Sequence, residues 1–152
     1  PTLGFAEMYL NNENIESQIR TIAVSRMVSK VAEISEVRAK LVEQQQEMGK
    51  DKGIVMDGRD ICTVVFPEAE LKLFMTASSK TRAQRRFDEL VEKGQHVTFE
   101  EVHQNVEERD YIDTHRDDSP LIKADDAIEI DNSSLNKKEQ FELVLSLVKE
   151  KL

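Results

Sequence analysis

The stretch Gly53-Ile-Val-Met-Asp57 is a short apolar run that ends in a carboxylate and is followed by Gly58. A buried parallel strand has this form, because both of its faces are covered and polar side chains follow at its carboxyl end. Leu71-Lys-Leu-Phe-Met-Thr76 has the same design, and so has Ala127-Ile-Glu-Ile-Asp131. We expect three strands of one parallel sheet, with ligands bound at the carboxyl ends of the strands.

Helices are expected between and after these strands. One helix is predicted over 79–93, and Thr98-Phe-Glu-Glu101 is a capping box that opens another, which we expect to reach His115. Asn136 is expected to cap the last helix, and Glu139 at the third helical position is expected to complete the cap. Strands that alternate with helices indicate an α/β fold with a parallel sheet.

The first 50 residues are expected to form a small, mostly helical unit. Phe5-Ala-Glu-Met-Tyr-Leu10 is typical of a short strand, and Asn11-Asn12 of the turn that closes it. Four apolar residues have the spacing of one buried helical face: Val24, Met27, Val28 and Val31. Ser35 is a candidate cap for a second helix, and Gly49 suits the left-handed residue after its end.

Composition restricts the class of protein and the kind of partner. The 152 residues suffice for one domain, and 30 acidic against 21 basic residues give a net charge of −9. Such a chain has no sequence-wide attraction to nucleic acid or anionic lipid, so an anion site must come from a local cluster of cations. The single cysteine excludes an internal disulfide, and no apolar run approaches the roughly 18 residues of a membrane span. We therefore expect a cytoplasmic protein with no nucleic-acid or membrane partner.

Arginines are unevenly distributed for so acidic a chain. Five gather on two expected helices: Arg82, Arg85, Arg86, Arg109 and Arg116. Asp113 lies between Arg109 and Arg116 at i, i+4, i+7 spacing, which sets cation, anion and cation along one ridge. Two interpretations remain open: a solvated, salt-bridged surface, or a nucleotide site in which guanidinium groups bind phosphate and the carboxylate binds sugar hydroxyls.

A second polar cluster, Asp57-Gly58-Arg59-Asp60, follows the first expected strand. It is either a polar turn or a site edge where Arg59 contacts an anion and Asp60 accepts a hydrogen bond. The phosphate-loop pattern G-x-x-x-x-G-K-[ST] does not occur in the sequence. The three histidines have no metal-ligand spacing with one another or with Cys62, so we expect no metal site built from these residues.

Six strings of the sequence, spread over most of its length, resemble bacterial cytidylate kinases. They are Ile54-Val-Met-Asp-Gly-Arg-Asp60, Thr63-Val-Val-Phe-Pro67, Arg82-Ala-Gln-Arg-Arg86, Glu107-Glu-Arg-Asp110, Ser119-Pro-Leu121 and Ala124-Asp-Asp-Ala127. The resemblance implies the fold of a P-loop nucleoside monophosphate kinase, a parallel sheet flanked by helices. It also implies that residues 1–50 are a monophosphate-binding insertion and that residues 51–152 are the C-terminal part of the kinase core, with a lid at about 82–115.

The resemblance assigns roles residue by residue. The residues implied to contact the cytosine base are Ser29, Arg38 and Asp60. Those implied to bind phosphate are Arg59 and Arg116, and those implied to bind the pentose are Arg109 and Asp113. The lid arginines implied to hold ATP and to close on the transferring phosphoryl group are Arg82 and Arg86, so the implied catalytic set is Arg82, Arg86 and Arg116.

The implied activity is transfer of the γ-phosphoryl group of ATP to CMP or dCMP, with Mg²⁺ accompanying ATP. Members of the family begin with a strand, a phosphate loop and a helix, which carry most of the Mg²⁺ ligands and have no counterpart in this sequence. We therefore expect an incomplete C-terminal portion that is inactive alone and open to self-association, whereas the complete enzyme is expected to be monomeric. The alternative, favoured only by the absent phosphate loop, is a non-catalytic module that binds a nucleotide or a partner protein.

Overall fold

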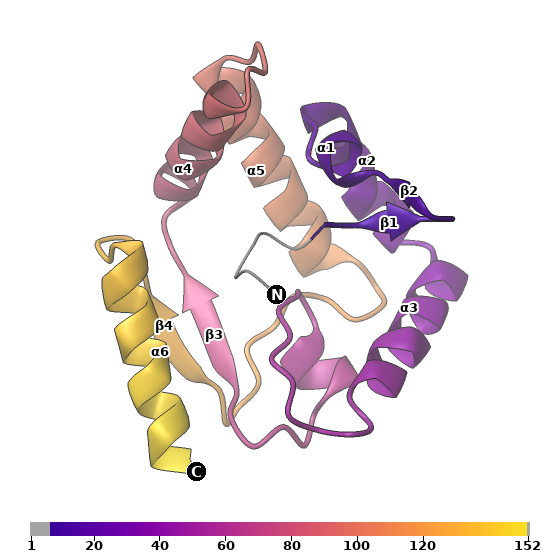
Figure 1. The fold of residues 1–152 in the computed structure, drawn as a ribbon, viewed down its shortest axis with the longest axis vertical. Coiled ribbons are helices and arrows are strands. Elements are labelled where there is room, and N and C mark those ends of the chain that lie inside the picture. Colours follow the sequence, from indigo (N-terminus) through magenta and orange to yellow (C-terminus); the bar gives the residue numbers. More distant parts are fainter. Residues whose placement is uncertain (1–6, 152) are drawn as a thin grey trace.

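The computed structural model describes residues 7–151, which form helices around a small parallel sheet (Figure 1). The elements, in chain order, are β1 (Tyr9–Leu10), β2 (Glu13–Asn14), α1 (Glu16–Ile19), α2 (Ile22–Ala32), α3 (Ser35–Met48), the π-helical turn η1 (Ile61–Val65), β3 (Leu73–Thr76), α4 (Ser79–Glu92), α5 (Phe99–His115), β4 (Ile128–Asp131) and α6 (Lys137–Lys151). The strand expected over 5–10 begins outside the described residues. Its end forms the hairpin β1–β2, whose turn residues Asn11 and Asn12 have φ of 50° and 67°.

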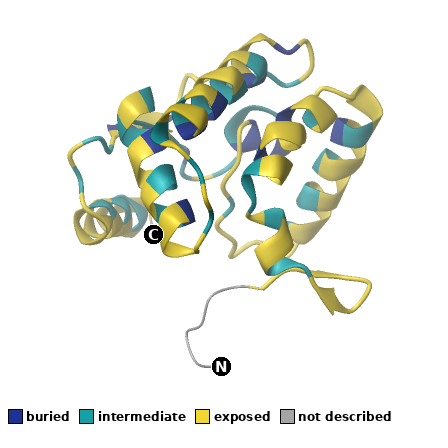
Figure 2. Ribbon diagram, turned by 90° about the horizontal axis from the view of Figure 1, so that it is seen from above, coloured by how far each residue is buried: buried dark blue, intermediate teal, exposed yellow. Residues whose placement is uncertain are grey.

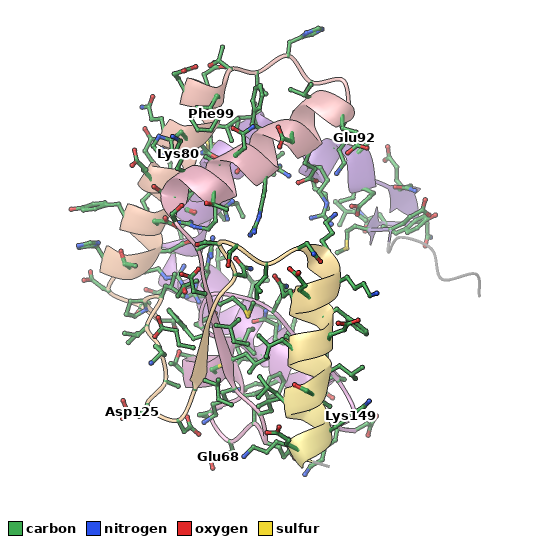
Figure 3. All side chains as sticks on the ribbon, turned by 90° about the vertical axis from the view of Figure 1, so that its left-hand side faces the viewer. Glu68, Lys80, Glu92, Phe99, Asp125 and Lys149 are labelled. Carbon is green, nitrogen blue, oxygen red and sulfur yellow. The ribbon has the colours of Figure 1, made fainter. Side chains whose placement is uncertain are left out.

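Strands β3 and β4 form the parallel sheet, with register from Leu73 opposite Ile128 to Thr76 opposite Asp131. Helix α6 lies beside these strands in both Figure 1 and Figure 3. Two helices, α4 and α5, separate β3 from β4 in the chain, as a crossover between parallel strands requires. The mixed helices and parallel strands agree with the expected α/β class, with two parallel strands among residues 7–151 where the sequence predicts three.

The prediction of a strand over Gly53–Asp57 is wrong, because these residues are irregular. Val55, in the middle of the run, is 99% exposed. A strand exists only when a neighbour pairs with its backbone, and no strand of the described part of the chain pairs with this segment. The run therefore leads as an extended loop into the polar residues Asp57-Gly58-Arg59-Asp60.

The hydrophobic core lies between α4 and α5, which pack side by side (Figure 1). Ala83, Leu90 and Val102 are fully buried there, and the rings of Phe87 and Phe99 meet edge to face at 6.2 Å. Local signals set the limits of these helices as predicted. Gly94, with φ of +74°, follows α4, and the Thr98–Glu101 capping box opens α5, which ends at His115. The two helices form one packed hairpin.

Helix α2 is confirmed, but the prediction that its apolar face is buried is wrong. The four apolar residues of that face are between 40% and 55% exposed: Val24, Met27, Val28 and Val31. The buried residues of α2 are Ser25 and Ser29, which face α5. The reason lies in α5, whose facing side chains Asn105 and Arg109 are polar and need hydrogen-bond partners. Figure 2 shows the buried positions on inward faces of the helices.

Helix α3 forms over the predicted residues, yet two details differ. Ser35 is its first residue and not its cap, and its hydroxyl bonds the Asp118 carboxylate. Gly49 has φ of −93°, so it is not the predicted left-handed residue. A Cβ atom at this position would collide with the ring of Phe66, which explains the glycine. The close approach of these segments brings the end of α3 against the loop that follows η1.

Candidate nucleotide-binding site

Polar side chains from four segments meet beside the carboxyl-terminal half of α5, which Figure 1 shows lying between α4 and α2. Helix α5 carries Arg109 and Asp113 one turn apart, and Arg116 is the first residue after it. The other members of the cluster come from α2, α3 and the loop before η1: Ser25, Ser29, Arg38, Arg59 and Asp60. Of these, Ser25, Ser29, Arg38, Asp60, Asp113 and Arg116 are buried.

Arg38 and Asp60 form a buried ion pair through Nη2 and Oδ2. The backbone of η1 fixes one partner, since the Asp60 carbonyl accepts hydrogen bonds from the amides of Val64 (2.9 Å) and Val65 (3.2 Å). Helix α3 packs on η1 and supplies the other partner, whose Nη1 donates to the Ala32 carbonyl at 3.4 Å. Arg38 Nε is buried and has no hydrogen-bond acceptor among the described residues. Arg38 Nε is therefore a buried donor that is left for an acceptor atom from outside residues 7–151.

Asp113 is 2% exposed and is held by two arginines. Arg116 Nη1 lies 3.3 Å from Oδ1, and Arg59 Nε lies 3.0 Å from Oδ2. Arg116 is itself fixed, because its Nε and Nη2 donate to the Ser119 carbonyl at 2.9 and 2.7 Å. Burial and the charge of nearby Arg38 lower the pKa of Arg116, yet a guanidinium stays protonated at neutral pH.

Arg109 differs from its neighbours because no carboxylate of the described chain forms an ion pair with it. Its Nε donates to Ser29 Oγ at 3.4 Å and its Nη1 to Ser25 Oγ at 3.3 Å, so both partners are neutral. Ser25 Oγ in turn donates to Asn105 Oδ1 at 2.9 Å. Burial, followed by the positive charge of Arg59, lowers the pKa of Arg109. A partly buried guanidinium that has no carboxylate in ion-pair contact and is repelled by a second arginine attracts an anion.

Arg82 and Arg86, the two arginines expected to lie in a lid, have other partners in this structure. Arg82 makes a bidentate pair with Asp110 (2.8 and 2.6 Å) and also donates to the Ala77 carbonyl at 3.0 Å. Arg86 binds Glu89 at 2.8 Å and the Arg20 carbonyl at 2.9 Å. The charge of Arg86 also lowers the pKa of Arg109, though less than burial and Arg59 do, so Arg86 borders the cluster.

The structure thus brings together seven of the residues that the sequence singles out: Ser29, Arg38, Arg59, Asp60, Arg109, Asp113 and Arg116. Arg82 does not join them, since its hydrogen bonds go to Asp110 and Ala77. Sequence reasoning missed Ser25 and Asn105. Their spacing was a usable signal, because Ser25 lies four residues before Ser29 and Asn105 four residues before Arg109, which places each pair on one helix face.

Among residues 7–151, no group of three or more His, Cys, Asp or Glu side chains is placed to hold a metal ion. Within the same range no helix combines the length and the apolar character that crossing a membrane requires.

Comparison with known proteins gives one consistent result. The family model described as cytidylate kinase matches residues 1–150. A cytidylate kinase of Flavobacterium johnsoniae is 77% identical over 146 residues, and one of Flavobacterium psychrophilum is 70% identical over 148 residues. A third, of Bacteroides thetaiotaomicron, is 58% identical over 142 residues.

The matches cover 96%, 97% and 93% of this chain but 64%, 66% and 62% of these relatives. The chain therefore spans less than two thirds of the length of the curated relatives it matches. The match nevertheless extends over almost all of the present residues, including the whole polar cluster beside α5. The chain belongs to the cytidylate kinase family.

Proposed function

We propose that this chain carries the acceptor site and the lid of an enzyme that transfers the γ-phosphoryl group of ATP to CMP or dCMP. One observation carries the proposal: the buried Arg38–Asp60 pair and Arg109, which forms no ion pair with a carboxylate of the described chain, belong to the same polar cluster. A nucleoside monophosphate needs both, because its base requires directional donors and acceptors and its phosphate requires cations.

The Arg38–Asp60 pair suits cytosine. Cytosine presents an exocyclic amine donor beside a ring-nitrogen acceptor and a carbonyl acceptor, so a carboxylate can accept from the amine while a guanidinium donates to the ring edge. The unpartnered Nε of Arg38 and the Ser29 hydroxyl add hydrogen-bonding capacity to the cluster. Uracil has a carbonyl where cytosine has the amine, and that carbonyl would face the Asp60 carboxylate without a proton between them.

The arginines beside this pair suit the phosphate and sugar. We assign Arg59 and Arg116 to the phosphate, and Arg109 with Asp113 to the pentose, with the charge of Arg109 adding to the attraction for phosphate. On this proposal residues 1–50 are the monophosphate-binding insertion, since α2 and α3 supply Ser29 and Arg38. Residues 82–115, which include the α4–α5 hairpin, are the lid.

For transfer, an oxygen of the CMP phosphate attacks the γ-phosphorus of ATP and ADP leaves. Enzymes accelerate this step chiefly by positioning the two phosphates and by neutralising their charge. This chain contributes the arginines that hold the attacking phosphate. We propose that, when ATP binds, Arg82 leaves Asp110 and Arg86 leaves Glu89, and that both turn toward the transferring phosphoryl group. Each guanidinium then has a phosphate as its anionic partner in place of a carboxylate.

The test combines turnover with binding. A coupled assay on the protein purified from its native source should show ADP formation that depends on CMP or dCMP and is slower with UMP. Calorimetric titration of residues 1–152 with CMP should show binding that UMP reproduces only weakly. Binding without turnover by the native protein would favour a non-catalytic module, and the absence of both would refute the assignment.

A further inference from the structure

The two arginines that hold Asp113 differ in how firmly they are themselves held. The Arg116 side chain is 3% exposed and makes two hydrogen bonds to the Ser119 carbonyl. The Arg59 side chain is 42% exposed, and its ion pair with Asp113 is its only side-chain contact of this kind in the described chain. One side of Asp113 is therefore closed by a fixed residue and the other by a residue that solvent reaches.

Arg59 has a second anion site within reach. Among its charged neighbours Arg59 lowers the pKa of Arg109 most strongly, Asp113 and Asp110 act in the opposite direction, and no carboxylate of the described chain forms an ion pair with Arg109. An anion that approached the two guanidinium groups would bind both and would relieve their mutual repulsion. Arg59 would then exchange Asp113 for the new anion without losing a charged partner.

The exchange matters because Asp113 is 2% exposed while Arg59 is in place. A sugar hydroxyl can donate to this carboxylate only after the Arg59 guanidinium moves aside. Arg116 stays behind as a partner, so the uncovered carboxylate is not left as an unpaired buried charge.

We propose that Arg59 covers Asp113 in the free protein, and that the phosphate of the ligand draws Arg59 away and so opens Asp113 to the ligand's sugar. The proposal rests on the proposed function, because it takes the ligand to be a nucleoside monophosphate. It adds an order of events and a coupling between the two halves of the ligand, because bound phosphate raises the affinity for the nucleoside. By linkage, bound nucleoside raises the affinity for phosphate by the same factor.

The first test compares CMP with cytidine, which lacks the phosphate, in calorimetric titrations of the chain and of the variant Arg59→Met. The variant should bind CMP at least about tenfold more weakly, as expected for the loss of a charged hydrogen bond. It should bind cytidine about two- to fivefold more tightly, because displacing a half-exposed ion pair costs that much in affinity. A loss of affinity for both ligands, or unchanged cytidine affinity, would overturn the proposal.

A matched control is Arg26→Met, which also removes one half-exposed arginine, but one that pairs with Glu101 in the first turn of α5 and has no ion pair with a residue of the cluster. This variant should leave cytidine affinity unchanged. If it tightened cytidine binding as much as Arg59→Met does, the effect would reflect net charge and the proposal would fall.

A second measurement uses inorganic phosphate as the probe. In the unsubstituted chain, phosphate at constant ionic strength should tighten cytidine binding severalfold, and in Arg59→Met it should have no effect. Absence of this coupling in the unsubstituted chain would overturn the proposal even if both ligands bind. If neither CMP nor cytidine binds the unsubstituted chain, it is the proposed function that fails, and this inference fails with it.

Discussion

Ser25 Oγ donates a hydrogen bond of 2.9 Å to Asn105 Oδ1 where α2 packs against α5. Both residues are buried, at positions where packed helices usually place apolar side chains. The same hydroxyl accepts a hydrogen bond from Arg109 Nη1 at 3.3 Å. Because the hydroxyl proton is directed at Asn105, its lone pairs face Arg109. Asn105 thus orients the guanidinium of a site residue through Ser25, without contacting a ligand itself.

Replacing Asn105 with leucine should therefore affect both stability and binding. The change keeps the side-chain volume but leaves the buried Ser25 hydroxyl without an acceptor, which should lower the free energy of unfolding by about 1–3 kcal/mol. CMP affinity should also fall, because Arg109 loses the hydroxyl orientation that positions it. Urea unfolding and calorimetric titration measure the two effects.

The double variant Ser25→Ala/Asn105→Leu separates these effects. It removes both hydrogen-bonding groups, so it should recover most of the stability lost in Asn105→Leu while CMP affinity stays low. Gln104→Ala, which changes an exposed neighbour on α5, should alter neither quantity. If the double variant is as unstable as the sum of the two single variants, the hydroxyl and the amide contribute independently and Asn105 does not act through Ser25.

The pairing of Asp60 with Arg38 predicts which residue selects the base. Asp60→Asn keeps the volume of the side chain but replaces a carboxylate oxygen by a donor that cannot accept from cytosine's amine. The ratio of kcat/KM for CMP to that for UMP should narrow by roughly ten- to hundredfold, since a mismatched buried polar pair costs about 1–3 kcal/mol. Steady-state assays on the protein from its native source give the ratio.

Two further variants check this assignment. Arg59→Ala should depress kcat/KM for CMP and UMP alike, because phosphate carries no information about the base. Asp60→Ala is a poorer probe than the asparagine variant. Both remove the charge partner of the buried Arg38, but only asparagine keeps an oxygen that accepts from its guanidinium, so the alanine variant should destabilise the fold by about 3–5 kcal/mol. An unchanged ratio in Asp60→Asn would move base selection to Ser29 and Arg38.

Local signals in the sequence predicted the helix limits well. The Thr98–Glu101 capping box and the Asn136–Glu139 cap both form as expected, because each partner lies within one turn of the other. The strand expected over 53–57 failed for the opposite reason. Its apolar composition is a property of the segment, whereas its pairing depends on a neighbour that the segment does not encode.

In the candidate site, too, the features that lie within one helix were predicted, whereas those that depend on tertiary packing were not. Spacing alone placed Arg109, Asp113 and Arg116 on one ridge, since all three belong to one helix or its end. Periodicity found α2 but gave the wrong buried face, because the polar face of α5 decides which side of α2 is covered. The pairing of Arg38 with Asp60 joins residues 22 positions apart, and only the tertiary packing of α3 on η1 shows it.

Glu89 on α4 predicts how stability depends on pH. Hydrogen bonds from Lys93 Nζ (2.6 Å) and, secondarily, Arg86 Nη1 (2.8 Å) hold the pKa of Glu89 below its ordinary value of 4.5. A carboxylate whose pKa is lower in the folded state stabilises the fold above its unfolded-state pKa, and this contribution is lost as the pH falls through the folded-state pKa. Glu89→Gln should therefore reduce the free energy of unfolding at neutral pH and make it decline less steeply from about pH 5 to about pH 3 in urea titrations. Lys93→Met, which removes the larger of the two contacts, should give an intermediate slope, and equal slopes in all three proteins would contradict the role of Glu89.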